Sequence, residues 1–261
     1  MCSSDLAGRP EAWLLGVRFD LYTRAELRAW IRELLASPAR TLHIAFSNSE
    51  FLLEARRNPR LRDYLNHCDW NFVDSTGVMV GLGFVNRRRR PVRLSGTVFV
   101  AMLCEEAAKT GASIFLFGSQ PGVAERAAAG LARRAPGLVV AGTADGFGDA
   151  PTVMDRIRET RPDIVSVCIG NPAQELWVEE HLPELDLKLV WGAGGALDFY
   201  SGDVPLAPDW VQRAGFEWLF RLVTNFSVAR LKRQLRLVQF VGLVLAERLR
   251  GGGGPRSGAR R

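Results

Sequence analysis

Short apolar runs alternate with helix-length amphipathic segments over most of this chain, and that alternation constrains its fold more than any other feature. The runs that we predict to be strands are Thr41–Phe46, Trp70–Val73, Ser113–Phe117, Leu138–Ala141, Asp163–Ile169 and Lys188–Trp191. The predicted helices are Arg24–Leu35, Glu50–Arg57, Gly77–Phe84, Thr97–Lys109, Val123–Arg134, Val153–Thr160 and Ala173–His181. Such alternation is typical of βαβ units. We therefore predict an α/β fold in which helices cover both faces of a parallel sheet.

The pattern changes after Trp191. A glycine-rich segment at residues 192–195 ends the last predicted strand, and from Pro208 onward the chain predicts only helices. Residues Val228–Arg250 indicate one or two basic amphipathic helices, followed by a glycine-rich, flexible end. We divide the chain into an N-terminal extension (residues 1–20), an α/β domain (21–205), a basic helical appendage (206–250) and a flexible tail (251–261).

The positive charge is concentrated in the C-terminal part. The 261 residues have a formal net charge of +6, yet Leu206–Arg261 alone holds 11 Lys and Arg against 3 Asp and Glu. The first 205 residues therefore carry a net charge of −2. A basic end on a near-neutral body favours an anionic surface or ligand at one end of the molecule. No aromatic and basic platform accompanies the tail or Arg87–Arg90, so nucleic-acid binding is not predicted.

Cysteine and histidine spacing argues against disulfides and structural zinc. Cys2, Cys68, Cys104 and Cys168 form no C-x-x-C pair, so we expect reduced thiols and a cytosolic protein. The three histidines have no metal-ligand spacing, and neither a metal nor another cofactor is predicted. The first ten residues show no secretory signal, and the longest apolar run near the C-terminus, Leu237–Ala246, is too short to span a bilayer.

Polar and glycine residues gather directly after the predicted strands. In an open parallel sheet, ligands bind at the carboxyl ends of the strands, so these residues are the candidates for chemistry. Arg93 lies near the expected mouth of the cleft and could pair with phosphate oxygens. The other candidates are Asn48, Asp74, Gly118, Gln174, Glu175 and Asp198.

Each candidate also has a structural interpretation. Asp74 suits a general base at a strand end, or an N-cap of the helix that follows. Gly118–Gly122 could bring backbone amides to a phosphate or form a simple tight turn, and it lacks a Walker lysine and G-x-G-x-x-G spacing. Asp198 suits a ligand residue or a cap, and Gln174 with Glu175 suits a binding pair or favourable first-turn charge.

Several segments together resemble one family, the WecG/TagA/CpsF glycosyltransferases (glycosyltransferase family 26). The most specific are Gly170-Asn-Pro-Ala-Gln-Glu175, Gly192-Ala-Gly-Gly-Ala-Leu-Asp198 and Phe216-Glu-Trp-Leu-Phe-Arg221. They occur in family order with Asn48 and Glu50, Val73–Val78, Arg93–Thr97, Ile114–Ala124 and Ala207–Trp210. The resemblance therefore extends over most of the chain, from Phe46 to Arg233.

This resemblance implies a Rossmann-like domain that transfers a sugar from a UDP-sugar to a polyprenyl-diphosphate-linked glycan in bacterial surface polysaccharide synthesis. It implies inversion at the anomeric carbon without a metal, with Asp74 as the general base. Asn48, Arg93, Gln174 and Asp198 match the family's pocket residues, and we add Gly118 and Glu175 to the predicted substrate-binding set. Arg221, Arg230 and Arg233 match a basic appendage that closes over the site and could hold the diphosphate, because guanidinium groups can stabilise the charge of a leaving UDP.

Five positions depart from the family pattern. Phe46 replaces a usual Thr, Ser75 a Gly, Val98 an Asp, Ala173 a Lys and Leu206 an Arg. Loss of the Lys and the Arg removes positive charge from the expected phosphate region, and the five changes favour a divergent subfamily with another sugar. The alternative to an active transferase is a catalytically weak or non-catalytic member that binds nucleotide sugar within a glycan-assembly complex.

Residues after Val228 combine basic side chains with a nearly continuous apolar run. This combination suits a helix lying in the interface of an anionic membrane, and it equally suits a helix docked on its own domain or on another subunit. We expect peripheral association with the cytoplasmic face of the cell membrane, and the sequence leaves formation of a homo-oligomer open.

Overall fold

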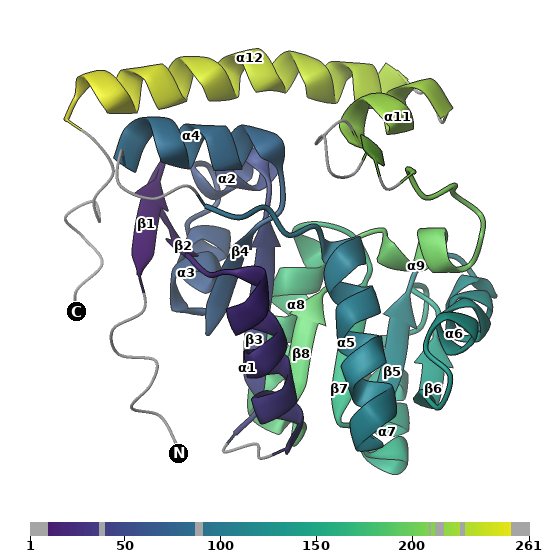
Figure 1. The fold of residues 1–261 in the computed structure, drawn as a ribbon. Helices are drawn as coiled ribbons and strands as arrows, with labels where there is room; N and C mark the ends of the chain where they lie inside the picture. The colour runs from purple at the N-terminus through teal and green to yellow at the C-terminus, as the bar shows by residue number, and fades with distance from the viewer. Residues whose placement is uncertain are drawn as a thin grey trace.

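The computed structural model of the protein describes residues 10–36, 40–86, 91–208, 210–211, 217–224 and 228–251. Its centre is a six-stranded parallel sheet in the order β4-β3-β8-β7-β5-β6 (Figure 1). The strands are β3 (Leu42–Ser47), β4 (Trp70–Val73), β5 (Ser113–Gly118), β6 (Val139–Ala144), β7 (Ile164–Cys168) and β8 (Leu189–Gly192). The parallel α/β sheet predicted from the alternation is confirmed, with strand ends shifted by at most three residues.

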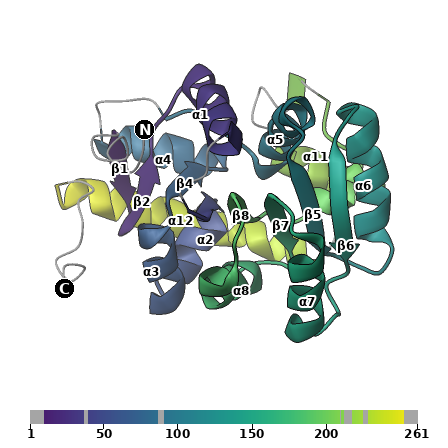
Figure 2. The same ribbon diagram turned by 90° about the horizontal axis from the view of Figure 1, so that it is seen from below.

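Helices cover both faces of this sheet (Figure 2). One face carries α1 (Arg24–Ala36), α5 (Gly96–Thr110), α6 (Val123–Arg134) and the short α9 (Ala196–Tyr200). The opposite face carries α2 (Ser49–Ala55), α3 (Pro59–His67), α7 (Ala150–Thr160) and α8 (Ala173–His181), with the 3₁₀ turn η1 at Leu182–Glu184. Because each strand of the central sheet meets a helical layer on both sides, β4, β7 and β8 are buried along their whole length.

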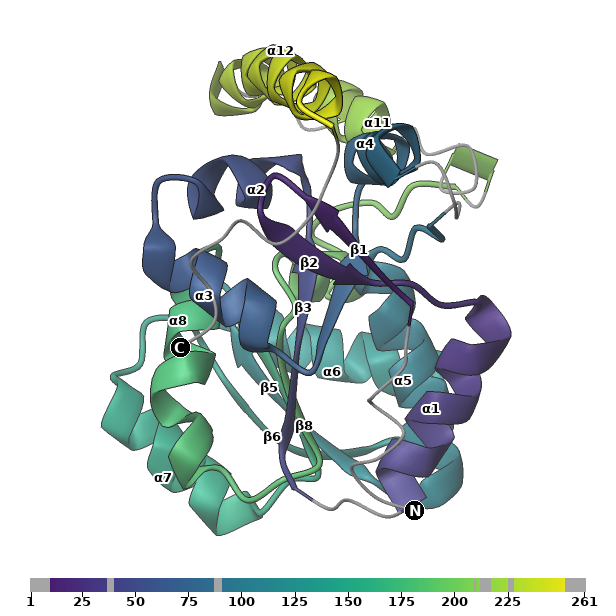
Figure 3. The same cartoon turned by 90° about the vertical axis from the view of Figure 1, so that its left-hand side faces the viewer.

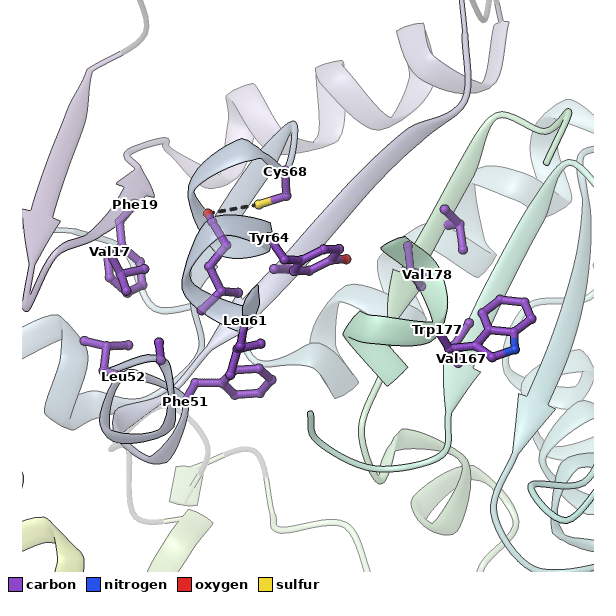
Figure 4. Close-up of a cluster of buried hydrophobic side chains, with 14 of the residues drawn as sticks. Val17, Phe19, Phe51, Leu52, Leu61, Tyr64, Cys68, Val167, Trp177 and Val178 are labelled. Carbon is purple, nitrogen blue, oxygen red and sulfur yellow. Dashed lines mark hydrogen bonds between the residues drawn. The ribbon is translucent and has the colours of Figure 1, made fainter. Parts of the chain in front are cut away.

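Two hydrophobic cores result, one on each face of the sheet. The core beneath α2, α3 and α8 joins Phe51 and Leu61 to Val167 and Trp177, and Figure 4 shows these side chains together. The other core lies beneath α1 and α5 and contains Phe72, Phe99 and Trp191. The second core is strongly aromatic because Phe46, Phe72, Phe99 and Trp191 stack with ring centroids 5.0–6.0 Å apart.

The chain begins with an element that the sequence analysis did not predict, an antiparallel hairpin of β1 (Glu11–Leu14) and β2 (Val17–Asp20). Its turn places Leu15 and Gly16 at positive φ, as a two-residue hairpin turn of this hand requires. The Asp20 carboxylate accepts a hydrogen bond from the Asn71 N–H at 2.8 Å, so the hairpin covers the exposed edge of β4.

The last helices lie across the carboxyl end of the sheet. The helix α12 (Val228–Leu249) runs over α2 and α4 (Thr76–Asn86), and α11 (Glu217–Thr224) lies at its other end (Figures 1 and 3). Phe240 and Val244 of α12 are buried against α4, where Gly77 and Gly81 give them room. Within the described ranges, no helix is both long and apolar enough to cross a bilayer.

Candidate active site

The candidate residues lie where parallel strands end on one edge of the sheet. Asn48 follows β3, Asp74 follows β4 and Ser119 follows β5. The loops after β7 and β8 are Gly170–Pro172, which contains a cis peptide bond before Pro172, and residues 193–195. Parallel strands bring these five loops to the same edge, below α12 and α11 (Figure 1).

Asp74 is half-buried at the end of β4 and faces the start of α5. Its N–H donates to the Ser47 carbonyl at 3.1 Å, which extends the β4–β3 pairing by one residue. Its Oδ1 accepts from the Gly96 N–H at 3.3 Å. The first-turn amide of α4, the Val78 N–H, donates to Ser75 Oγ at 3.3 Å, so Ser75 contributes to the N-terminal cap of α4.

Arg93 lies beside the same strand end. The neighbouring Leu94 N–H donates to the Val73 carbonyl at 2.8 Å, so the segment between α4 and α5 runs along the end of β4. The Arg93 side chain is half-buried, like that of Asp74. The fold therefore brings one carboxylate and one guanidinium to the end of β4 from the two sides of α4, about twenty positions apart in sequence.

Asn48 acts as the N-cap of α2. Its Oδ1 accepts hydrogen bonds from the Glu50 and Phe51 amides at 2.9 and 3.1 Å. The cap fixes the orientation of the Asn48 amide at the end of β3.

Gly118 and Ser119 bring β5 close to β7. Gly118 has φ of +127°, and a Cβ there would lie 2.4 Å from the Cys168 carbonyl group, so only glycine fits. The Ser119 N–H donates to the Cys168 carbonyl at 3.0 Å, and Ser119 Oγ donates to Asp198 Oδ1 at 2.5 Å. The predicted turn at Gly118 thus serves to connect Asp198, in the first turn of α9, to the β5 loop.

Gln174 and Glu175 point inward from the first turn of α8. Both side chains are 2% exposed, and Gln174 Nε2 donates to Glu175 Oε1 at 2.6 Å. Gln174 Oε1 accepts from the Gly194 N–H at 3.1 Å. Burial raises the pKa of the Glu175 carboxyl to about 8, although the hydrogen bond from Gln174 favours the charged form.

The five departures from the family pattern fall in different environments. Phe46 is buried in the aromatic core below the site, and Ser75 caps α4. Val98 is half-buried against the same core as Phe46. Ala173 and Leu206 are exposed, the first at the start of α8 and the second after α9.

The three predicted appendage arginines lie on the C-terminal helices. Arg221 is on α11, and Arg230 and Arg233 are in the first two turns of α12. Their side chains lie outside the described residues. Among the residues that the structure describes, no group of three or more His, Cys, Asp or Glu side chains could hold a metal ion.

The sequence analysis missed the positioning contacts. Ser119 was part of a glycine-rich turn in the sequence, and its bond to Asp198 spans 79 residues. Gly192 was a strand end, and the structure shows that a Cβ there would lie 2.4 Å from Glu175 Oε1 and 2.5 Å from Gln174 Nε2. A glycine after a buried strand is the only sequence signal for such an approach.

A carboxylate, an arginine, amide side chains and glycine-rich turns at the carboxyl edge of a parallel α/β sheet are what a ligand-binding enzyme site of this fold class contains. The model of the Glycosyl transferase WecG/TagA/CpsF family matches residues 12–253. The chain therefore belongs to the WecG/TagA/CpsF family and is a glycosyltransferase.

A relative from Bacillus spizizenii (strain ATCC 23059 / NRRL B-14472 / W23) shows the kind of enzyme to which the chain is similar. It is named N-acetylglucosaminyldiphosphoundecaprenol N-acetyl-β-D-mannosaminyltransferase. The two chains are 30% identical over 203 residues, which cover 77% of this chain and 78% of the relative. The family resemblance given by the sequence motifs is confirmed.

Proposed function

We propose that this glycosyltransferase moves a sugar from a UDP-sugar to N-acetylglucosamine carried on a polyprenyl diphosphate, in the synthesis of a bacterial surface polysaccharide. The name of the relative supports the acceptor, because that enzyme acts on N-acetylglucosaminyldiphosphoundecaprenol. The placement of Asp74 supports the chemistry, because a carboxylate at the carboxyl edge of the sheet can receive the proton of a bound hydroxyl.

In the proposed step, an acceptor hydroxyl oxygen attacks the anomeric carbon of the donor. The bond between that carbon and the β-phosphate oxygen breaks, and UDP leaves with the electron pair. Asp74 takes the hydroxyl proton, and attack opposite the leaving group inverts the anomeric centre. Arg93 and the appendage arginines Arg221, Arg230 and Arg233 would stabilise the negative charge that develops on UDP.

The hydrogen bond from Gly96 supports Asp74 as the base. It reaches Oδ1 at 3.3 Å and orients the carboxylate at the junction of β4 and α5. A general base must be held in a defined orientation to come within hydrogen-bond reach of its proton, and the hydrogen bond from the Gly96 backbone supports such an orientation.

The remaining candidate residues would line the site that binds the sugar donor. Asp198 is held by Ser119 and would accept hydrogen bonds from hydroxyl groups of the nucleotide sugar. Asn48 and Gly118 lie at the neighbouring strand ends, where the substrate would lie, and the buried Gln174 supports the loop beside them. We propose these residues as the substrate-binding set.

Asp74→Asn tests the proposal. The amide keeps the shape but cannot take a proton, so we expect transfer to fall by about 10²- to 10⁴-fold. Release of UDP from UDP-N-acetylmannosamine and other UDP-hexoses, with a short-chain polyprenyl-diphosphate N-acetylglucosamine as acceptor, measures it. Thermal shift with UDP should stay as in the unmodified protein.

The matched control is Asp155→Asn on α7, an exposed carboxylate far from the strand ends. It should transfer at the unmodified rate. Full activity of Asp74→Asn would contradict the assignment of the base. Binding of UDP without turnover of any UDP-hexose by the unmodified protein would instead favour the non-catalytic alternative.

A further inference from the structure

The pair formed by Gln174 and Glu175 is buried more deeply than a first-turn charge or a substrate contact requires. Both residues are 2% exposed. Pro172 occupies the N-cap position of α8 and makes no side-chain capping hydrogen bond. Glu175 Oε2 has no hydrogen-bond partner among the described residues. An acidic side chain in such a place needs a reason other than helix capping.

Glu175 is connected through Gln174 to the loop after β8. Glu175 Oε1 accepts from Gln174 Nε2 at 2.6 Å, and Gln174 Oε1 in turn accepts from the Gly194 N–H at 3.1 Å. Both side chains lie against Gly192, where a Cβ would come within 2.4–2.5 Å of them. The two ends of the Gln174 amide are thus both in use, one by Glu175 and the other by the loop.

This loop leads directly into α9 and Asp198. Gly194 has φ of +58°, the Ala193 N–H donates to the Val167 carbonyl at 2.8 Å, and α9 begins at Ala196. Asp198, in the first turn of α9, accepts from Ser119 on the β5 loop. Two sets of side-chain hydrogen bonds, one from Glu175 to Gly194 and one from Ser119 to Asp198, therefore hold the two ends of the short segment at residues 194–198.

We propose that Glu175 is a positioning residue of the transferase: its buried carboxyl orients the Gln174 amide, and Gln174 holds the Gly192–Gly195 loop that carries α9 and Asp198. Glu175 acts through Gln174 and touches no substrate. Either protonation state offers Gln174 an acceptor at Glu175 Oε1. An ionised carboxyl would leave an unpaired charge buried beside the Gly192–Gly195 loop, so the packed arrangement is held with this carboxyl neutral.

The surroundings favour that neutral form. Removal from water raises the pKa of Glu175 to about 8. Tyr64 of α3 faces it, and burial keeps the Tyr64 phenol neutral by raising its pKa well above 10. The charged groups around α8 pair elsewhere: Arg60 of α3 binds Glu179 at 2.6 Å, and Glu184 of η1 lies 3.9 Å from His181. No cation therefore offsets an ionised Glu175 among these described neighbours.

Glu175→Gln and Glu175→Leu separate positioning from direct catalysis. Gln keeps an acceptor for Gln174 and should change kcat by no more than about threefold, since one neutral hydrogen bond replaces another. Leu removes the acceptor, and we expect a loss of kcat on the order of 10²-fold, as a small misplacement of a site produces. Glu180→Gln, an exposed carboxylate on the same helix, is the control.

The dependence of transferase activity on pH also tests the positioning role, because a residue that only fills the core would not change it. Activity of the unmodified enzyme should fall above about pH 8, where Glu175 ionises, whereas Glu175→Gln should lack this fall and Glu180→Gln should keep it. An unchanged alkaline fall in Glu175→Gln, or a loss in Glu175→Gln as large as in Glu175→Leu, would overturn the proposal.

Hydrogen exchange tests the same inference independently of the donor and acceptor named above. The Gly194 amide should exchange faster in Glu175→Leu than in the unmodified protein, and at the unmodified rate in Glu175→Gln and Glu180→Gln. Equal exchange in all four proteins overturns the proposal. Absence of turnover with every UDP-sugar in the unmodified protein bears on the proposed function alone, because the exchange measurement still decides the role of Glu175.

Discussion

At the scale of single residues, Glu175 shows what hydrophobic surroundings do to an acid. Its pKa in the folded protein is about 8, against an ordinary value of 4.5. Between these values the folded chain keeps a proton that the unfolded chain has released. The protein is therefore most stable with respect to this group below about pH 4.5, and loses that stability as the pH rises to about 8.

Glu175→Gln should remove this dependence, because an amide does not titrate. The difference in free energy of unfolding, Glu175→Gln minus the unmodified protein, should therefore increase from pH 5 to pH 8. The increase should be no more than about 1.4 kcal/mol per pH unit. Urea denaturation at pH 5, 6, 7 and 8 measures the difference. A constant difference over this range would show that Glu175 is ionised in the folded protein.

Sequence reasoning found most of the candidate residues but not their contacts. Asp74 and Asp198 could be predicted because parallel strands end at one edge, which is a rule about topology. The inward direction of Glu175 could not, because a Glu in the first turn of a helix equally suits exposure and favourable helix-end charge. The inward direction of Glu175 depends on the space that Gly192 leaves by having no side chain. Gly192 is about twenty positions away, so the local sequence around Glu175 does not show this space.

At the scale of elements, the hairpin of β1 and β2 is joined to helix α12 by a buried hydrogen bond. Glu247 of α12 accepts the Leu15 N–H at 2.8 Å through its Oε2, and Glu247 is 9% exposed. Leu15 lies in the hairpin turn with φ of +55°, and the bond to Glu247 satisfies its buried amide. The periodic pattern predicted α12 correctly as a helix, but the hairpin escaped prediction because Leu15 is not a residue that marks such a turn.

Glu247→Ala should destabilise the protein by about 1.5–3 kcal/mol, because it leaves a buried amide without its charged acceptor. Chemical denaturation followed by tryptophan fluorescence measures this change. Glu247→Gln keeps an acceptor and should lose less. Equal stability of Glu247→Ala and the unmodified protein would mean that the bond between α12 and the hairpin contributes nothing.

At the scale of the whole molecule, we propose that α12 docks the enzyme on an anionic membrane. Its inner face buries Phe240 and Val244, while an outer row remains exposed, with Val238 73% and Leu249 88% exposed. The other exposed apolar residues on α12 and the adjoining α4 are Leu237, Val241, Leu245, Val80 and Phe84, and Arg248 lies over the Phe84 ring. Apolar side chains beside cations suit an anionic bilayer interface.

A double change of Val241 and Leu245 to Ser should lower co-sedimentation with anionic vesicles by several-fold, since it removes two of the apolar contacts with lipid. Circular dichroism should stay unchanged because both side chains face away from the core. Vesicles of phosphatidylcholine alone provide the reference for the basic residues. Unchanged binding of the double variant to anionic vesicles would contradict docking through α12.

The packing of α12 on the hairpin also has a consequence for synthesis. Leu15 and Glu247 are 232 residues apart, so a ribosome has completed nearly the whole α/β sheet before α12 leaves its exit tunnel. Until then the Leu15 amide and the small-residue face of α4 at Gly77 and Gly81 stay open to water or to a chaperone. Until α12 has been synthesised, the nascent enzyme therefore exposes the surface of α4 on which α12 packs.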